Sequence, residues 1–168
     1  MRAVVSQRGE SVSLLSCMRR ELCVVDLCAA SRKRALEHAS ERIAEALREG
    51  PTQDAIFDGL LARERLGSTG LGFGVALPHC RLAGLKDPVV ALLRLREPVD
   101  FESPDGDPVD LLAVLVVPEN THGEHLALLS ALAQLLEPEA HRRALRRAGD
   151  AKTLAATLER LAETAQTA

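Results

Sequence analysis

Two long apolar runs in the second half of the chain predict buried β-strands. Val89–Leu95 is almost wholly apolar, and Val109–Val117 is nearly continuous in valine and leucine. Such runs are typical of strands that are covered on both faces of a sheet, because no alternation with polar positions is needed there. An earlier strand is predicted over Leu22–Cys28, and the polar segment Pro98–Pro108 is expected to form a loop.

Apolar residues at intervals of three or four predict helices between and after these strands. Ser31 is a suitable N-cap for the first helix, which we expect to end before Gly50 and Pro51. A second helix is expected to run from about Thr52 to Gly67, since glycine is common just after a helix end. The inward-facing residues of these two helices are Leu36, Ala39, Ile43, Leu47, Ile56, Leu60 and Leu61. Further helices are predicted over 123–136, 138–147 and 150–162.

Strands and helices are intermixed along the chain, which predicts an α/β fold with a mixed β-sheet flanked by helices on both faces. A chain of 168 residues suits one domain with a sizeable core, and we expect that domain to span residues 21–165. Residues 1–20 are expected to form a poorly ordered N-terminal extension. Polar residues at positions 7–10 interrupt its apolar positions, so it lacks the apolar core of a signal peptide.

A glycine-rich segment connects the second helix to a short apolar stretch. Four glycines lie within eight residues, at Gly67, Gly70, Gly72 and Gly74. Glycine at this density predicts backbone with positive φ or close approach to another group. Val75–Leu77 suits a short buried strand, and Pro78 favours extended geometry before it. His79 is therefore expected at a strand end, a rigid mounting suited to a reactive side chain.

The glycine-rich segment does not match the common nucleotide-binding motifs. A Walker motif ends in GK[ST], and the dinucleotide fingerprint is GxGxxG between a strand and a helix. Here the pattern is GxGxG, it lies after a helix and before a strand, and it contains no lysine. Ser68 also lacks the GxSxG context of a hydrolase nucleophile.

Composition narrows the classes of partner. The chain is 46% hydrophobic but only 2% aromatic, with no Trp or Tyr, so platforms that stack on bases or sugars are nearly absent. A net charge of −3 gives no basic footprint for nucleic acid. We interpret one local basic cluster as a solvated helix face; it comprises Arg142, Arg143, Arg146 and Arg147.

The cysteines and the hydropathy indicate a cytoplasmic protein. Cys17, Cys23, Cys28 and Cys80 form neither a CxxC motif nor a paired zinc spacing, and free thiols in a reducing cytoplasm are the simpler interpretation. No apolar stretch is long enough to insert into and span a membrane.

The histidines allow two kinds of site. His38 and His141 are interpreted as surface residues of helices. His122 and His125 flank the start of a helix, where exposed N–H groups favour an anion. A zinc site built from these two and His79 is one alternative, but His-x₂-His is a weak signal without a carboxylate or thiolate at matching spacing. Our prediction therefore includes neither a metal nor a cofactor.

The other alternative is phosphoryl transfer, provided that His79, His125 and Arg63 meet in space. A neutral imidazole nitrogen is nucleophilic near physiological pH, while a carbonyl can hold the other ring nitrogen as N–H. Arg63 would supply a fork for phosphate oxygens, and His125 could donate a further hydrogen bond. Without further information, an ordinary cation on a helix surface is the favoured interpretation of Arg63.

Two blocks of sequence resemble a known family, the EIIA proteins of the bacterial phosphoenolpyruvate-dependent phosphotransferase system, in the fructose/mannitol class and nearest its nitrogen-regulatory branch. The more specific block reads RERLGSTGLGFGVALPHCRL, and the supporting block reads PVDLLAVLVVPENTHGEHLALLSALAQLL. The resemblance spans roughly Arg20 to Glu163. It implies a mixed β-sheet flanked by helices, with His79 as the phosphorylated residue, His125 as the second active-centre histidine and Arg63 as a phosphate contact.

The same resemblance implies partners. Members accept a phosphoryl group from an HPr-like phosphocarrier, which enzyme I charges from phosphoenolpyruvate. We expect a regulator that controls target proteins such as kinases or potassium transporters through its phosphorylation state, because no EIIB or membrane portion is fused here. A phosphocarrier that serves a sugar-permease EIIB, and a binding module that is never phosphorylated, are the alternatives. Cys80 stands where many relatives have glycine, and we expect a tolerated substitution rather than a thiol sensor.

Overall fold

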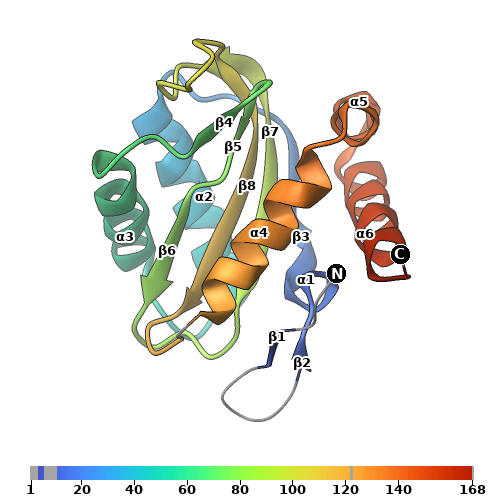
Figure 1. The fold of residues 1–168 in the computed structure, drawn as a ribbon. Helices are drawn as coiled ribbons and strands as arrows, with labels where there is room; N and C mark the ends of the chain where they lie inside the picture. Colours follow the sequence, from blue (N-terminus) through green and yellow to red (C-terminus); the bar gives the residue numbers. More distant parts are fainter. Residues whose placement is uncertain (1–3, 6–10, 122, 168) are drawn as a thin grey trace.

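The computed structural model describes residues 4–5, 11–121 and 123–167 (Figure 1). Its helices are α1 (Leu14–Cys17), α2 (Arg32–Leu47), α3 (Gln53–Arg65), α4 (Glu124–Leu136), α5 (Glu139–Arg147) and α6 (Ala151–Thr167). Its strands are β1 (Val4–Val5), β2 (Ser11–Val12), β3 (Met18–Leu27), β4 (Gly70–Gly72), β5 (Val75–Ala76), β6 (His79–Leu82), β7 (Val89–Val99) and β8 (Val109–Pro118).

Six of these strands form one open sheet in the order β3-β7-β8-β5-β4, and β6 pairs with β8 beyond the end of β5. The β7–β8 and β4–β5 pairs are antiparallel, whereas β3–β7, β5–β8 and β6–β8 are parallel. The predicted mixed sheet is therefore confirmed. The short strands β1 and β2 form a separate antiparallel pair.

Strand β8 is buried on both faces, as its continuous apolar sequence predicts. Alternate side chains point to opposite faces of a strand, and each face has its own core. One core includes Leu111, Ala113, Leu115 and Val117 and is completed by α1, α4, α5 and α6. The other includes Leu112, Val114 and Val116 and is completed by α2 and α3. Figure 1 shows α4 in front of the sheet and α2 behind it, so the predicted helices on both faces are also confirmed.

The predicted starts of the first two long helices are confirmed by their caps. The Ser31 hydroxyl accepts a hydrogen bond from the Arg34 N–H at 3.2 Å, and the Thr52 hydroxyl accepts one from the Ala55 N–H at 3.1 Å. Each bond satisfies one N–H group that the helix itself leaves unpaired. Among the helices in the described ranges, none is both long enough and apolar enough to cross a bilayer.

The N-terminal part of the fold differs from the sequence prediction. Leu14 and Cys17 in α1 are 1% and 2% exposed and belong to the core, and β3 already begins at Met18. Residues 14–20, which the prediction places in a poorly ordered extension, are therefore part of the folded structure. The start of β3 gives no apolar run in the sequence, because it contains the polar residues Arg19, Arg20 and Glu21. Helix α1 has only four residues, which is too short for a helical period to be recognised.

The strand predicted over Val75–Leu77 is observed as β5, and the glycine-rich segment before it forms a further strand, β4, which pairs antiparallel with β5. Gly72 and Gly74 have φ values of +91° and +77°, which side-chain-bearing residues rarely adopt. Gly70 is tightly packed, since a Cβ atom there would lie 2.3 Å from the Ser103 hydroxyl oxygen. The group that approaches this segment closely is thus the chain's own 98–108 loop.

The expectation of a solvated arginine face is wrong for Arg142. Its side chain is buried at 7% exposure, its guanidinium donates to the carbonyls of Leu136 and Glu137, and its guanidinium carbon lies 4.4 Å from the centre of the Phe73 ring. The last carbonyls of a helix lack partners within that helix. Arg142 supplies donors to the end of α4, which makes its burial favourable.

Candidate functional site

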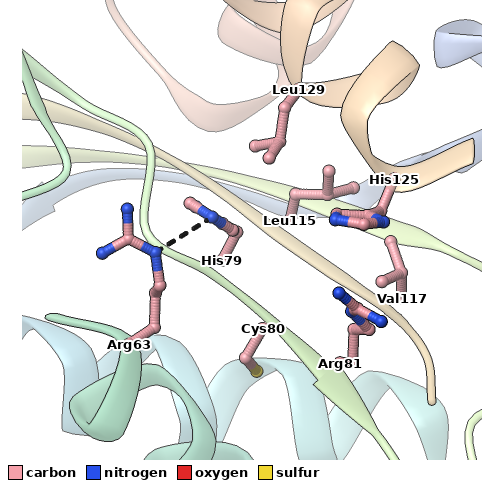
Figure 2. A pocket seen from close by; sticks show the side chains of 8 residues that line it. All are labelled: Arg63, His79, Cys80, Arg81, Leu115, Val117, His125 and Leu129. Atoms are coloured by element: carbon pink, nitrogen blue, oxygen red, sulfur yellow. Dashed lines mark hydrogen bonds between the residues drawn. The ribbon is translucent and has the colours of Figure 1, made fainter. Parts of the chain in front are cut away.

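A pocket of about 220 Å³ lies where α3, β6, β8 and α4 meet (Figure 2). Its lining comprises Arg63, His79, Cys80, Arg81, Leu115, Val117, His125 and Leu129. The three predicted site residues therefore border one cavity, although Arg63 and His125 are 62 positions apart in the chain. The parallel pairing of β6 with β8 brings them together, because α4 follows β8 and begins beside β6.

His79 is half-buried at the first position of β6, and two contacts define its protonation state. Its Nδ1 atom lies 2.8 Å from the carbonyl oxygen of Leu77, and the Arg63 Nε–H donates to its Nε2 atom at 3.2 Å. A carbonyl can only accept a hydrogen bond and a guanidinium can only donate one. The ring is therefore neutral, with its proton on Nδ1 and a lone pair on Nε2.

The surroundings of His79 favour this neutral form. Burial lowers its pKa below the ordinary histidine value of 6.5, and the nearby positive charge of Arg63 lowers it further. The Leu77 carbonyl and the Glu64 carboxylate act in the opposite direction, but the net shift of the pKa is downward. A neutral imidazole with an available Nε2 is a nucleophile.

Arg63 belongs to the last turn of α3 and reaches the pocket from the side opposite His125 (Figure 2). Besides its contact with His79, it donates from Nη1 to the carbonyl oxygen of Gly67 at 2.9 Å. This second bond ties the guanidinium to the turn that ends the helix. A guanidinium has five N–H donors in a planar fork, so a fixed Arg63 can hold an anion beside His79.

His125 is in the first turn of α4, and its ring faces the pocket (Figure 2). Its Nδ1 atom is buried and has no hydrogen-bond partner among the described residues. Burial lowers the pKa of His125, and the positive charge of Arg81 lowers it further. A polar atom of this kind, near the positive end of a helix dipole, is suited to an anionic ligand.

Arg81 also lines the pocket, and the sequence analysis missed it. It lies two positions after His79 in β6, and residues two apart in a strand share a face. Once β6 is known to be a strand, this alternation places a second guanidinium on the face that carries His79.

Cys80, between these two residues, points away from His79 toward α3 (Figure 2). A Cβ atom added to Gly59 of α3 would lie only 3.0 Å from its sulfur. Burial raises the pKa of the Cys80 thiol to about 12. Since the thiolate is the reactive form of cysteine, this environment does not suit a thiol sensor.

We expect Cys80 to react with iodoacetamide at neutral pH at least about ten times more slowly than exposed Cys28 does, because burial leaves little of Cys80 as thiolate and restricts access to its sulfur. Peptide mass spectrometry of a time course measures both sites in one sample, so Cys28 is the internal control. Equal labelling rates at the two cysteines would contradict the burial argument and revive a redox role for Cys80.

The zinc alternative depended on His122, which lies outside the described residues. Within residues 4–5, 11–121 and 123–167, no three histidine, cysteine or carboxylate side chains are close enough to hold a metal ion.

Comparisons with known proteins identify relatives of this chain. The profile of the family described as phosphoenolpyruvate-dependent sugar phosphotransferase system, EIIA 2, matches residues 16–161. A nitrogen regulatory protein of Pseudomonas aeruginosa is 48% identical over 131 residues, which cover 78% of this chain and 84% of that protein. A nitrogen regulatory protein of Escherichia coli is 38% identical over 147 residues, which cover 86% of this chain and 88% of that protein.

Solved structures give the same result. The nitrogen regulatory protein IIA-Ntr of Neisseria meningitidis superposes with a TM-score of 0.79 at 41% identity, covering 86% of this chain and 98% of that one. The mannitol IIA of Escherichia coli superposes with a TM-score of 0.67 at 21% identity, and the match covers 81% of this chain and 95% of the mannitol IIA chain. The two proteins therefore share the fold. With a family profile that spans most of its length, this chain belongs to the EIIA 2 family of the phosphoenolpyruvate-dependent phosphotransferase system.

Proposed function

We propose that this protein is the phosphoryl-accepting regulator of a nitrogen-type phosphotransferase system and that His79 is the acceptor. The observation that carries the proposal is the neutral His79 ring, whose Nε2 lies 3.2 Å from Arg63 Nε in a pocket also lined by Arg81 and His125. The names of the relatives support a regulatory role.

The transfer step follows from these positions. The hydrogen bond from Arg63 Nε–H to Nε2 of His79 first breaks. The freed Nε2 lone pair then attacks the phosphorus of a phosphohistidine on an HPr-like carrier, which enzyme I has charged from phosphoenolpyruvate. The new N–P bond forms at Nε2 as the donor's N–P bond breaks, and the donor nitrogen keeps that electron pair. The Leu77 carbonyl holds the Nδ1–H and favours the positive charge that develops on the ring. Arg63 and Arg81 stabilise the negative phosphoryl oxygens, and His125 donates to them.

Phosphorylation would change the binding properties of this face. A phosphoryl group adds about −1.5 to −2 charges at neutral pH, and it would do so in a pocket bordered by two arginines and a histidine. Target proteins, such as kinases or potassium transporters, would then distinguish the two forms by charge. Because the family description names a sugar phosphotransferase system, transfer onward to an EIIB domain is the second candidate function.

Incubation with phosphoenolpyruvate, enzyme I and an HPr-like carrier tests the proposal. We expect intact-mass spectrometry to find one added phosphoryl group that is lost in mild acid, and ³¹P–¹⁵N NMR to assign it to Nε2 of His79. If no cognate carrier transfers phosphate, the protein is a binding module instead. Rapid loss of the label to an isolated EIIB domain would favour the carrier function over the regulator.

Phosphoryl acceptance is expected to persist at pH values below 6.5 and to fail only as the pH falls through the lowered pKa of His79. Above that pKa the Nε2 atom carries no proton and its lone pair can be released from Arg63 for attack, whereas below it a proton occupies the lone pair. Initial rates between about pH 5 and 8, together with an NMR titration of the His79 ring, measure this dependence. The NMR titration is the control, since it does not depend on the donor. A titration midpoint above 6.5 would contradict the prediction.

A further inference from the structure

One buried carboxylate near the pocket has no part in the transfer step described above. Glu64 follows Arg63 in α3, but its side chain is only 2% exposed and does not line the pocket. Removing a charged carboxylate from water costs several kcal/mol unless donors replace the water. Its donors are the backbone N–H and the hydroxyl of Thr69, at 3.1 Å and 2.6 Å, and Arg32 lies 3.6 Å away.

Thr69 connects this carboxylate to the nucleophile through the backbone. Its carbonyl oxygen accepts a hydrogen bond from the Leu77 N–H at 3.0 Å. Leu77 in turn presents its carbonyl oxygen to Nδ1 of His79 at 2.8 Å. The peptide groups of Thr69 and Leu77 therefore link the buried carboxylate to the contact that holds the His79 proton on Nδ1.

The same carboxylate also stabilises the turn that holds Arg63. Residues 66–69 connect α3 to β4, and Glu64 binds the far end of that turn through Thr69. Between those ends lies Gly67, whose carbonyl accepts the hydrogen bond from Arg63 Nη1 at 2.9 Å. A shift of this turn would thus move the partners of both Arg63 and His79.

We propose that Glu64 and Thr69 are positioning residues, forming a buried clamp that holds the His79 ring in its Nδ1–H form and the Arg63 guanidinium beside it. The inference rests on the proposed phosphoryl transfer for its catalytic consequence, whereas its effect on the His79 ring can be measured without any donor. Neither residue touches the transferred group. They act by keeping Nε2 of His79 and the guanidinium of Arg63 in position at the pocket before a phosphoryl donor binds.

Thr69→Val tests the clamp, because valine keeps the branched shape and loses only the hydroxyl donor. We expect the maximal rate of phosphoryl acceptance to fall about 10- to 100-fold, with little change in the donor concentration that gives half that rate. ¹⁵N NMR of the unphosphorylated variant is expected to show a mixture of Nδ1–H and Nε2–H forms at His79, in place of one form. Thr69→Ser retains the hydroxyl and should restore both properties.

Ser40→Ala is the matched control. Ser40 is fully buried in α2, and its hydroxyl donates to the Leu36 carbonyl at 2.8 Å, with no link to His79. The Ser40→Ala variant should have a lower melting temperature, because it loses a buried hydroxyl. Its His79 NMR spectrum and its rate of phosphoryl acceptance should be unchanged. If Thr69→Val is too unstable to study, Glu64→Gln, which keeps the shape and removes the charge, is expected to give the same NMR change.

The outcomes separate this inference from the proposed function. Wild-type protein that accepts no phosphate would overturn the phosphoryl transfer, while the NMR comparison would still decide the clamp. A Thr69→Val or Glu64→Gln protein with a single Nδ1–H form and a wild-type rate would overturn the clamp. Thr69 and Glu64 would then only stabilise the fold, as Ser40 does.

Discussion

His79→Gln is expected to abolish phosphoryl acceptance while the protein stays folded. Glutamine has a similar length and can still accept from Arg63, but its amide nitrogen has no lone pair available for attack on phosphorus. No other histidine of the pocket replaces it, because His125 lies on a separate element, α4, and lacks a carbonyl partner for its Nδ1 among the described residues. Intact-mass spectrometry after incubation with the donor system measures the result.

His141→Gln is a close control for this variant. His141 is also partly buried, and its Nδ1 lies 2.6 Å from the carbonyl oxygen of Leu135, so its ring has the same kind of carbonyl contact as His79. It lies in α5 and does not line the pocket. We expect full phosphorylation of the His141 variant. Phosphate on the His79→Gln protein would show that the acceptor is elsewhere.

The strands and helices that form the core were predictable, because their buried positions appear in the sequence as continuous or regularly spaced apolar residues. Strand β8 supplies apolar side chains to the cores on both faces of the sheet, and α2 and α3 begin at side-chain caps that can be read directly from the sequence. The prediction failed where burial depends on a partner far away in the chain. Arg142 is the clearest example, since only the end of α4 makes its burial favourable.

The candidate site was predictable in its residue types but not in its geometry. The segment around His79 indicates a rigidly mounted imidazole, and the family resemblance adds Arg63 and His125. Their convergence depends on the parallel pairing of β6 with β8, a long-range contact with no local signature. Glu64 and Arg81 were missed because each has the sequence context of an ordinary surface charge, and their roles follow from the direction of the side chain.

The loop over 98–108 shows how a polar segment can still contribute to the core. Phe101 within it is fully buried and belongs to the α2–α3 side of the core, although its neighbours in sequence are mostly charged or polar. Its carbonyl oxygen accepts the hydroxyl hydrogen bond of Ser68, in the turn that follows Arg63. Phe101 therefore anchors the loop to the core through its side chain and to the glycine-rich segment through its carbonyl group.

Phe101→Ala is expected to lower the free energy of unfolding by about 3–5 kcal/mol, because a phenyl ring in a close-packed interior leaves a cavity that its neighbours fill only in part. The surrounding core is made of smaller aliphatic side chains, so none replaces the lost volume. Urea denaturation followed by circular dichroism measures the change. The control is Phe73→Ala, which deletes the same ring where it is 65% exposed and contacts Arg142, and which should cost about 1 kcal/mol or less. Equal losses in the two variants would mean that the 98–108 loop does not anchor the core.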